Sequence, residues 1–239
     1  MKRYLPLIII VGVLSVALAA GVTMWRSSKQ SSSASQPFTQ PTPATTASQP
    51  VAPNRTPVPP TGQTMAASVH VRGAANAKVT LEEYGDYQCP PCGLLFHDLK
   101  AIEKEYGSQM RFVFRHFPLS GHIHARTAAH AAEAAGLQGR FWEMHDMIYQ
   151  NQMSWSSAVD ARSFFIQYAR DLRLDVDRFT RDMNSPEVAA RVTSDYDRGM
   201  SLGVTGTPTI YMNGQLVNSA AYTPDGLRKG LDYLLGKAK

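Results

Sequence analysis

The sequence predicts an α/β domain in which a βαβ unit and a ββα unit are separated by a block of helices. Segments rich in β-forming residues lie on both sides of a helical segment between residues 77 and 117. Residues 122–202 are interpreted as a series of helices. An Asn213-Gly214 turn signal within residues 203–217 then predicts a β-hairpin, and a helical segment at 223–237 follows it.

The first unit contains strand-like segments at 70–73 and 77–87. After the cysteines, apolar residues recur at helical spacing over residues 94–106, and Gly107 ends the run. The segment 110–117 alternates and is rich in β-forming residues. A strand, a helix and a second strand form a crossover, which favours parallel pairing of the two strands.

The helical block separates this unit from the final hairpin. Without it, the chain has the βαβ–ββα order of the thioredoxin fold, so we expect a helical insertion at about residues 119–203. Pro186 is suited to the first turn of a helix, and Thr223 is suited to cap the last one. The block is expected to contain helical segments at 124–136, 140–150, 157–172, 175–183 and 186–203.

The net charge of +5 belongs to the N-terminal part of the chain. Five basic residues precede Ser68, whereas the first acidic residue is Glu82, so the part from Ser68 onward is balanced. The alkaline balance of the whole chain is therefore no evidence for binding of nucleic acid.

Two segments are expected to precede the domain at 68–239. Within residues 1–26, the run from 5 to 25 is uncharged, and it reaches the about 20 residues that span a bilayer. We expect an uncleaved inner-membrane anchor there; a signal peptide cleaved near the "ALA" sequence, which would release a secreted protein, is the alternative. Residues 27–67 are rich in Ser, Thr, Pro and Gln, which predicts a disordered tether. The domain is then extracytoplasmic, on the periplasmic side.

Cys89 and Cys92 are the only cysteines, and they stand in the sequence CPPC at the start of a predicted helix. The free N–H groups and the positive dipole end of a helix stabilise a thiolate there. Pro90 suits this position because its missing N–H group was unpaired anyway. Cys92, about one turn deeper, can resolve a mixed disulfide. The pattern predicts Cys89 as the nucleophile and Cys92 as the resolving thiol.

Two other uses of the pair are disfavoured. A structural disulfide across so short a loop constrains the unfolded chain little. A zinc site needs four ligands, and the chain has no second CxxC, while His122 and His124 form a pattern of low specificity. We expect no metal and no cofactor. The following histidines and aromatic residues are interpreted as packing in the core or the insertion: His116, His122, His124, His130, His145, Phe141, Trp142 and Trp155.

Several separated motifs resemble the DsbA-like thiol–disulfide oxidoreductases of the thioredoxin superfamily. The resemblance runs from about Lys78 to the C-terminus and implies the thioredoxin fold with an inserted helical lid. The motifs are VTLEEYGDYQCPPC at 79–92, FRHFPL at 114–119, AAEAAG at 131–136, FWEMHDMIYQNQ at 141–152 and GVTGTPTIYMNG at 203–214.

The resemblance also implies site residues outside the CPPC sequence. Thr207-Pro208 resembles the loop with a cis proline that packs against the cysteine pair and can pair with an extended substrate. Glu83 occupies the place of the buried acid that exchanges a proton with the resolving thiol. Glu82 becomes the inward residue if the strand register shifts by one. The family's best-known oxidases carry Pro-His between the cysteines, so the Pro-Pro dipeptide leaves the direction of electron flow open.

We therefore expect an extracytoplasmic disulfide oxidoreductase that transfers disulfides to reduced or misoxidised exported proteins. Reoxidation then requires a membrane partner of the DsbB or vitamin-K-epoxide-reductase type. A membrane-tethered reductase or isomerase of the same fold is the alternative, and a peptide-binding chaperone without redox activity is a further one. The reduction potential of the cysteine pair distinguishes the two directions.

Overall fold

The computed structural model describes residues 70–237. The predicted anchor at 1–26 and the predicted tether at 27–67 lie outside these residues. Within the described part of the chain, no helix combines the length and the apolar character that a membrane crossing requires.

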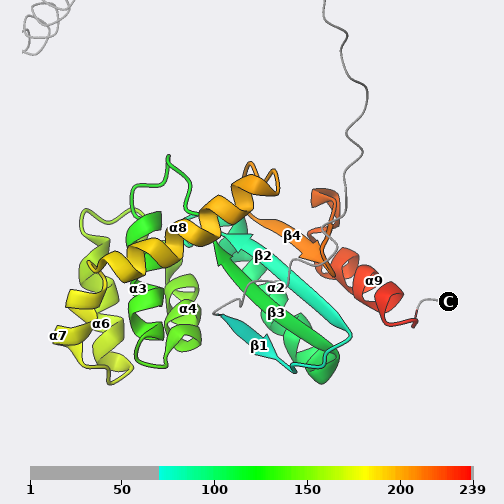
Figure 1. Ribbon diagram of the computed structural model, residues 1–239, viewed down its shortest axis with the longest axis horizontal. Helices are drawn as coiled ribbons and strands as arrows, with labels where there is room; N and C mark the ends of the chain where they lie inside the picture. Colours follow the sequence, from blue (N-terminus) through cyan, green and yellow to red (C-terminus); the bar gives the residue numbers. More distant parts are fainter. Residues whose placement is uncertain (1–69, 238–239) are drawn as a thin grey trace, which may run out of the picture. The chain divides into compact units, whose positions relative to one another are not determined.

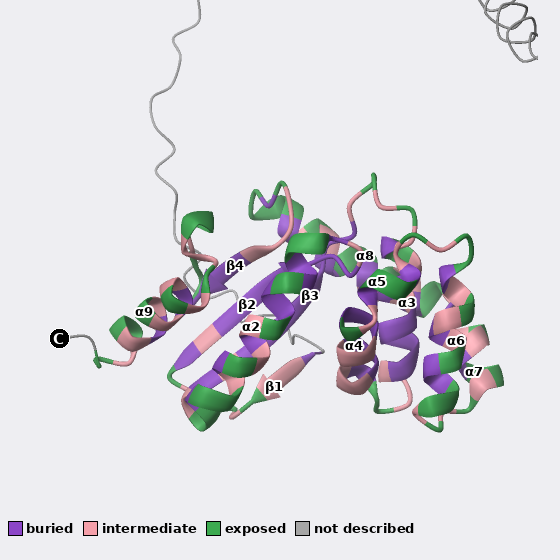
Figure 2. Ribbon diagram, turned by 180° about the vertical axis from the view of Figure 1, so that it is seen from behind, coloured by how far each residue is buried: buried purple, intermediate pink, exposed green. Residues whose placement is uncertain are grey.

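A five-stranded mixed sheet forms the centre of the domain, in the order β1-β3-β2-β4-β5. The central strands β2 and β3 are parallel, as the predicted crossover requires, whereas β1 and β4 join them antiparallel. Figure 2 shows buried residues along both central strands. The strands are β1 (Val71–Gly73), β2 (Val79–Gly85), β3 (Met110–His116), β4 (Thr209–Met212) and β5 (Gln215–Leu216).

Helices cover both faces of this sheet. In Figures 1 and 2, α2 lies on one face and α8 crosses the other. The fold is the predicted thioredoxin-like α/β fold, with α3 to α8 inserted between β3 and β4. The helices are α2 (Pro90–Tyr106), α3 (Ala125–Gly136), α4 (Phe141–Gln150), α5 (Gln152–Trp155), α6 (Ala161–Asp171), α7 (Val176–Asp182), α8 (Pro186–Ser201) and α9 (Pro224–Leu234), with short 3-10 helices η1 (Gly107–Gln109) and η2 (Ser219–Ala221).

The helix ends follow local capping chemistry. Thr223 caps α9 and Pro186 stands in the first turn of α8, as predicted, and Ser185 caps α8. The predicted helix at 157–172 begins later, because the Asp160 side chain accepts a hydrogen bond from the backbone of Arg162 and so caps α6. The short helix α5, beginning at Gln152, was not predicted.

Neighbouring residues of β2 face opposite layers of the fold. Val79 and Leu81 belong to the main core, whereas Tyr84 packs in a smaller cluster with Phe117. Helix α8 approaches this second cluster closely, since a Cβ atom added at Gly199 would lie 2.7 Å from the Phe117 ring and 2.9 Å from the Tyr84 ring. A glycine is therefore required at the point where the insertion meets the sheet.

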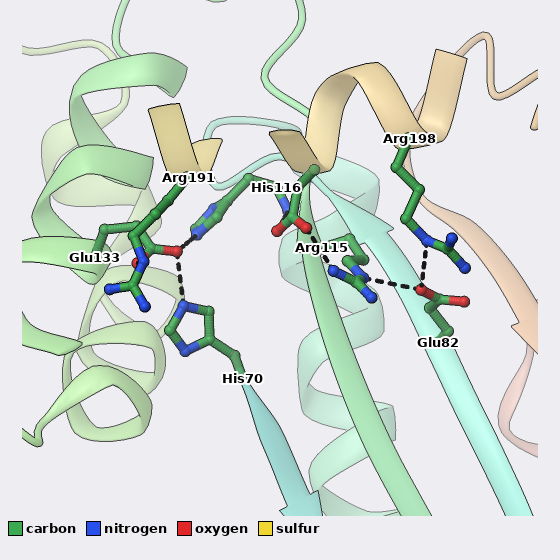
Figure 3. Close-up of polar contacts among 8 residues, drawn as sticks. His70, Glu82, Arg115, His116, Glu133, Arg191 and Arg198 are labelled. Carbon is green, nitrogen blue, oxygen red and sulfur yellow. Dashed lines mark hydrogen bonds and ion pairs between the residues drawn. The ribbon is translucent and has the colours of Figure 1, made fainter. Parts of the chain in front are cut away.

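A buried charge network also joins α8 to the sheet (Figure 3). Arg115 on β3 lies 2.9 Å from a Glu82 oxygen on β2 and 2.7 Å from an Asp195 oxygen on α8. Arg198 lies 3.6 Å from the same Glu82 oxygen. Two buried carboxylates thus share the Arg115 guanidinium. Loss of this guanidinium would leave both carboxylates without their shared partner, so it contributes to the free energy of unfolding.

Replacing Arg115 with Met should lower the free energy of unfolding by about 3–5 kcal/mol, because Glu82 and Asp195 lose their shared partner in a buried site. Equilibrium unfolding in urea measures the change. Arg140→Met breaks an exposed pair, 2.7 Å apart, between the N-cap of α4 and Glu143 in its first turn, and should cost less than about 1 kcal/mol. Equal losses in the two variants would contradict the assigned role of Arg115.

Candidate active site

Cys89 is the N-cap of α2, and the two prolines occupy the first two helical positions. A helix start leaves four N–H groups without intrahelical partners. Here the N–H group of Cys89 donates to the Asp86 carbonyl at 3.1 Å, and Pro90 and Pro91 have none. The N–H group of Cys92 is the remaining one. The Cys89 side chain does not cap the helix by accepting a hydrogen bond in the way that a serine or threonine does. The Cys92 N–H group nevertheless helps to lower the pKa of Cys89.

The loop before β4 faces the Cys89 sulfur. The Thr207–Pro208 peptide bond is cis, as the resemblance implies. The Cys89 thiol donates to the Thr207 carbonyl oxygen at 3.3 Å. Pro208 lines a surface hollow of about 340 Å³ together with residues from Gly203 to Tyr222. The structure therefore brings Cys89, Thr207 and Pro208 together, as the family resemblance implies.

The two sulfurs have opposite acidity. A hydrogen bond from the Cys92 thiol is the largest influence on Cys89 and lowers its pKa to about 6; burial opposes this shift, and the Thr207 side chain supports it. Burial is the main reason that the pKa of Cys92 lies well above its ordinary value. Cys89 is therefore the thiol that ionises at neutral pH, and thiolates are the reactive species in disulfide exchange.

Glu83 is the carboxyl group beneath this pair. It is buried, and its Oε1 atom has no hydrogen-bonding partner among the described residues. Burial raises the pKa of Glu83 to about 8, with a further contribution from Cys89. The adjacent Glu82 points to the opposite face, toward Arg115 and Arg198. The register left open by the sequence therefore places Glu83 on the cysteine side.

The insertion contributes a side chain that sequence reasoning missed. The Gln152 amide nitrogen donates to the carbonyl of Tyr87 at 2.7 Å and to that of Cys89 at 2.9 Å. A Cβ atom added at Gly93, directly after the cysteine pair, would overlap the Gln152 amide oxygen. The glycine in CPPCG therefore makes room for the glutamine. The only sequence signal was a polar residue at the end of the FWEMHDMIYQNQ motif.

Gln88 forms a second link between the cysteine loop and the insertion. Its amide donates to the carbonyl of Ser156 at 2.8 Å and accepts from the backbone of His124 at 2.6 Å. His122 contacts Asp86, and His124 contacts the Ala158 carbonyl at 2.8 Å. These two histidines therefore belong to the surroundings of the site, and their interpretation as packing alone was incomplete.

A cluster away from the cysteines has the composition of a metal site. His70, His116 and Glu133 place ligand atoms within 4.8 Å of one another. Both histidines already contact the same Glu133 oxygen, at 2.6 Å and 3.1 Å, and Arg191 lies 3.6 Å from the other oxygen (Figure 3). A neighbouring guanidinium disfavours a bound cation, so the arrangement suits a buried carboxylate neutralised by protein donors.

Comparison with known proteins identifies the family. A family model described as Thioredoxin matches residues 66–233. The chain belongs to the thioredoxin family. Its Cys89–Cys92 pair stands in a DsbA-like fold, which confirms the family resemblance drawn from the separated sequence motifs.

Two solved structures share this fold over most of their own length. Oxidised BdbD from Bacillus subtilis is 23% identical, with a TM-score of 0.63, and the match covers 70% of this chain and 92% of BdbD. A thioredoxin-like oxidoreductase from Silicibacter pomeroyi is 26% identical, with a TM-score of 0.58, covering 71% of this chain and 93% of that one.

Among curated relatives, the Na(+)/H(+) antiporter NhaA 1 of Salinispora arenicola is 41% identical over 147 residues. The match covers 61% of this chain and 22% of the antiporter, so the chain spans about a fifth of that relative's length.

Gly93→Ala should lower the free energy of unfolding by about 1–3 kcal/mol, because the new methyl group displaces the Gln152 amide. In a Gln152→Ala background, the same change should be neutral or stabilising, since alanine is the better helix former. Urea unfolding of the four proteins measures the coupling. Gly121→Ala, where no atom lies within 4 Å of the added Cβ, is the control. Additive losses would contradict the proposed contact.

Glu83 should make stability fall as pH rises. Its pKa is about 8 in the folded protein, against 4.5 ordinarily, so the unfolded chain releases the proton first. The stabilisation is full below about pH 4.5 and is lost as pH rises through 8. Glu83→Gln should flatten this pH dependence in urea unfolding, whereas Glu105→Gln, an exposed site, should not. An unchanged slope in Glu83→Gln would show that Glu83 ionises normally.

Proposed function

We propose that this protein is an extracytoplasmic thiol–disulfide oxidoreductase that transfers disulfides to exported proteins through Cys89 and Cys92. The observation that carries the proposal is the surroundings of Cys89. Its sulfur lies at a helix N-terminus, ionises at neutral pH, and faces the carbonyl of Thr207 in the loop with the cis proline. A structural disulfide requires none of these features.

The reaction starts from the Cys89–Cys92 disulfide. A substrate thiolate attacks the Cys89 sulfur, a mixed disulfide forms, and Cys92 leaves as a thiolate. Cys92 then takes up a proton, because burial strongly disfavours its charged form. Glu83, protonated below about pH 8, is suited to supply that proton.

A second substrate thiolate completes the transfer. It attacks the substrate sulfur of the mixed disulfide, and Cys89 leaves as a thiolate. The substrate has lost two electrons and gained a disulfide, and the Cys89–Cys92 pair is now the dithiol. The low pKa of Cys89 favours this step, since a more acidic thiol is the better leaving group.

Exposed apolar side chains near the cysteines support a protein substrate. Leu94 follows Gly93 on α2, Met153 follows Gln152 on α5, and Ile123 lies in the loop before α3; all three are largely exposed. Unfolded polypeptides expose apolar groups that such a surface can contact. The hollow beside Pro208 is suited to an extended segment of the same substrate.

The proposed location and partner rest on the sequence. The apolar run at 5–25 supports an inner-membrane anchor, and residues 27–67 support a tether that lets the domain reach substrates from it. Regeneration of the disulfide requires an oxidant, for which we propose a membrane partner of the DsbB or vitamin-K-epoxide-reductase type.

Cys89→Ser should reduce oxidation of a reduced, unfolded substrate to the uncatalysed rate, because the attacked sulfur is gone. Cys92→Ser cannot form the Cys89–Cys92 disulfide and should also fail to oxidise the reduced substrate. When it is given a peptide that already carries a disulfide, its Cys89 thiolate should attack that bond, and the mixed disulfide should accumulate because the resolving thiol is missing. Thiol titration and non-reducing electrophoresis measure the two results. Undiminished oxidation by Cys89→Ser would exclude the proposal, and peptide holding without thiol exchange would support a chaperone instead.

The reduction potential of the wild-type pair tests the direction of electron flow. A stabilised Cys89 thiolate stabilises the dithiol form and makes the disulfide more oxidising. We expect a value more oxidising than the about −270 mV of thioredoxin and less oxidising than the about −120 mV of DsbA, because the pKa of about 6 for Cys89 lies between those of their reactive thiols. A value near the about −270 mV of thioredoxin would indicate a reductase.

A further inference from the structure

Asp86 places a buried carboxylate three residues before Cys89. Its Oδ1 atom accepts from the backbone N–H group of Gln88 at 2.7 Å. Its Oδ2 atom accepts from the N–H group of Leu119 at 2.9 Å and contacts His122 Nδ1 at 2.7 Å. A carboxyl group that meets donors on both oxygens is held in its ionised, acceptor-only form. Asp86 therefore places a negative charge inside the loop.

This charge acts on the nucleophile. The turn from Asp86 to Cys89 is closed by the bond from the Cys89 N–H group to the Asp86 carbonyl, and the contacts with Gln88, Leu119 and His122 hold the Asp86 side chain in this loop. A negative charge beside a thiol disfavours the thiolate, and the Asp86 charge does oppose the low pKa of Cys89.

His122 is the residue that can neutralise Asp86. It lies in the loop between β3 and α3, and 28% of its side chain is exposed, while the Asp86 side chain has no exposure. The imidazole can therefore exchange protons with solvent while it contacts a buried carboxylate. Histidine is also the side chain whose charge ordinarily changes between pH 5 and 8.

Three buried titratable groups near the pair do not change charge in the same range. Glu83 on β2, Cys92 on α2 and Tyr149 on α4 all have raised pKa values, and burial is the largest cause for each. They stay neutral below about pH 8, the pKa of Glu83. His124, whose ring contacts the Ala158 carbonyl at 2.8 Å, is the other histidine beside this loop.

We propose that His122 and Asp86 form a charge pair that sets the nucleophilicity of Cys89 and makes it depend on the protonation of His122. Protonated His122 neutralises Asp86 and favours the thiolate. Neutral His122 leaves Asp86 uncompensated and disfavours it. His122 is a positioning and charge-compensating residue, because it acts on the sulfur through Asp86. This inference rests on the proposed redox function of Cys89.

The pair has a distinct effect on the pH profile. As pH falls, proton uptake by His122 makes proton uptake by Cys89 harder, so the two titrations are coupled. The Cys89 thiolate should therefore remain ionised to a lower pH than it would without His122. Its titration curve should also be broader than that of a single independent site. A residue that merely stabilised the loop would change the yield or the melting temperature without changing the shape of this curve.

The experiment titrates the Cys89 thiolate in the full-length dithiol protein, by absorbance at 240 nm and by the rate of alkylation with iodoacetamide. His122→Gln should lower the alkylation rate at pH 6.5 by roughly three- to tenfold, the size of one partly screened charge. It should also convert the titration to a single-site curve. Asp86→Asn should raise the rate, and His122→Gln should have no further effect in the Asp86→Asn background.

Two controls separate charge from structure. His122→Lys supplies a permanent cation and should keep the fast alkylation of the wild type. His97→Gln removes an exposed histidine from the face of α2 and should change nothing. Circular dichroism and thermal melts establish that each variant is folded; if Asp86→Asn does not fold, His122→Gln and His122→Lys still decide the question.

A His122→Gln rate and curve shape equal to the wild type would overturn the charge pair. So would the same His122→Gln effect in the Asp86→Asn background. The thiolate titration needs no substrate protein, so its result is independent of whether the wild type oxidises substrates. Failure of disulfide transfer would count against the proposed function, and an unchanged titration would count against the charge pair alone.

Discussion

The first turn of α2 has few backbone donors, because both residues between the cysteines are prolines. A helix that starts at a cysteine ordinarily offers several N–H groups to the sulfur, but here the N–H group of Cys92 is the one left in that turn. Stabilisation of the Cys89 thiolate must therefore come from elsewhere. The Cys92 thiol and the Thr207 side chain supply it, whereas the Asp86 charge, which His122 contacts, opposes it. Each comes from a different turn or loop, so the acidity of one sulfur depends on the packing of several elements.

Adjacent acids on β2 show two ways of burying a carboxyl group. Glu82 faces α8, where Arg115 and Arg198 neutralise it. Glu83 faces the cysteines without a cation, and burial keeps it protonated to about pH 8. Successive side chains of a strand point to opposite faces of the sheet. The adjacent residues Glu82 and Glu83 can therefore serve as a structural carboxylate and as a proton-carrying acid. The charged network binds the insertion to the sheet, while the neutral acid stays available to Cys92.

The sequence predicted what is local and periodic. The order of strands and helices, Pro186 in the first turn of α8, the cap at Thr223, and the place of Cys89 all follow from short-range patterns. The proximity of Thr207 and Pro208 required the family resemblance, because about 120 residues separate them from the cysteines. Gln152 and Asp86 were not foreseen. The role of Gln152 depends on the carbonyl groups that the fold brings within hydrogen-bonding distance, and the role of Asp86 depends on the His122 imidazole. Neither contact can be predicted from the residue type alone.

The contact between Gln152 and Gly93 limits how the redox motif can be exchanged between proteins. A CPPC sequence moved into another member of the family would carry its prolines and sulfurs, but not the amide from α5 that fixes the carbonyls of Tyr87 and Cys89. Conversely, a chain with a bulkier residue after the second cysteine has no room for that amide. The motif and the insertion are therefore structurally coupled, and a chimera that takes them from two different proteins would lose the contact between Gln152 and the cysteine loop.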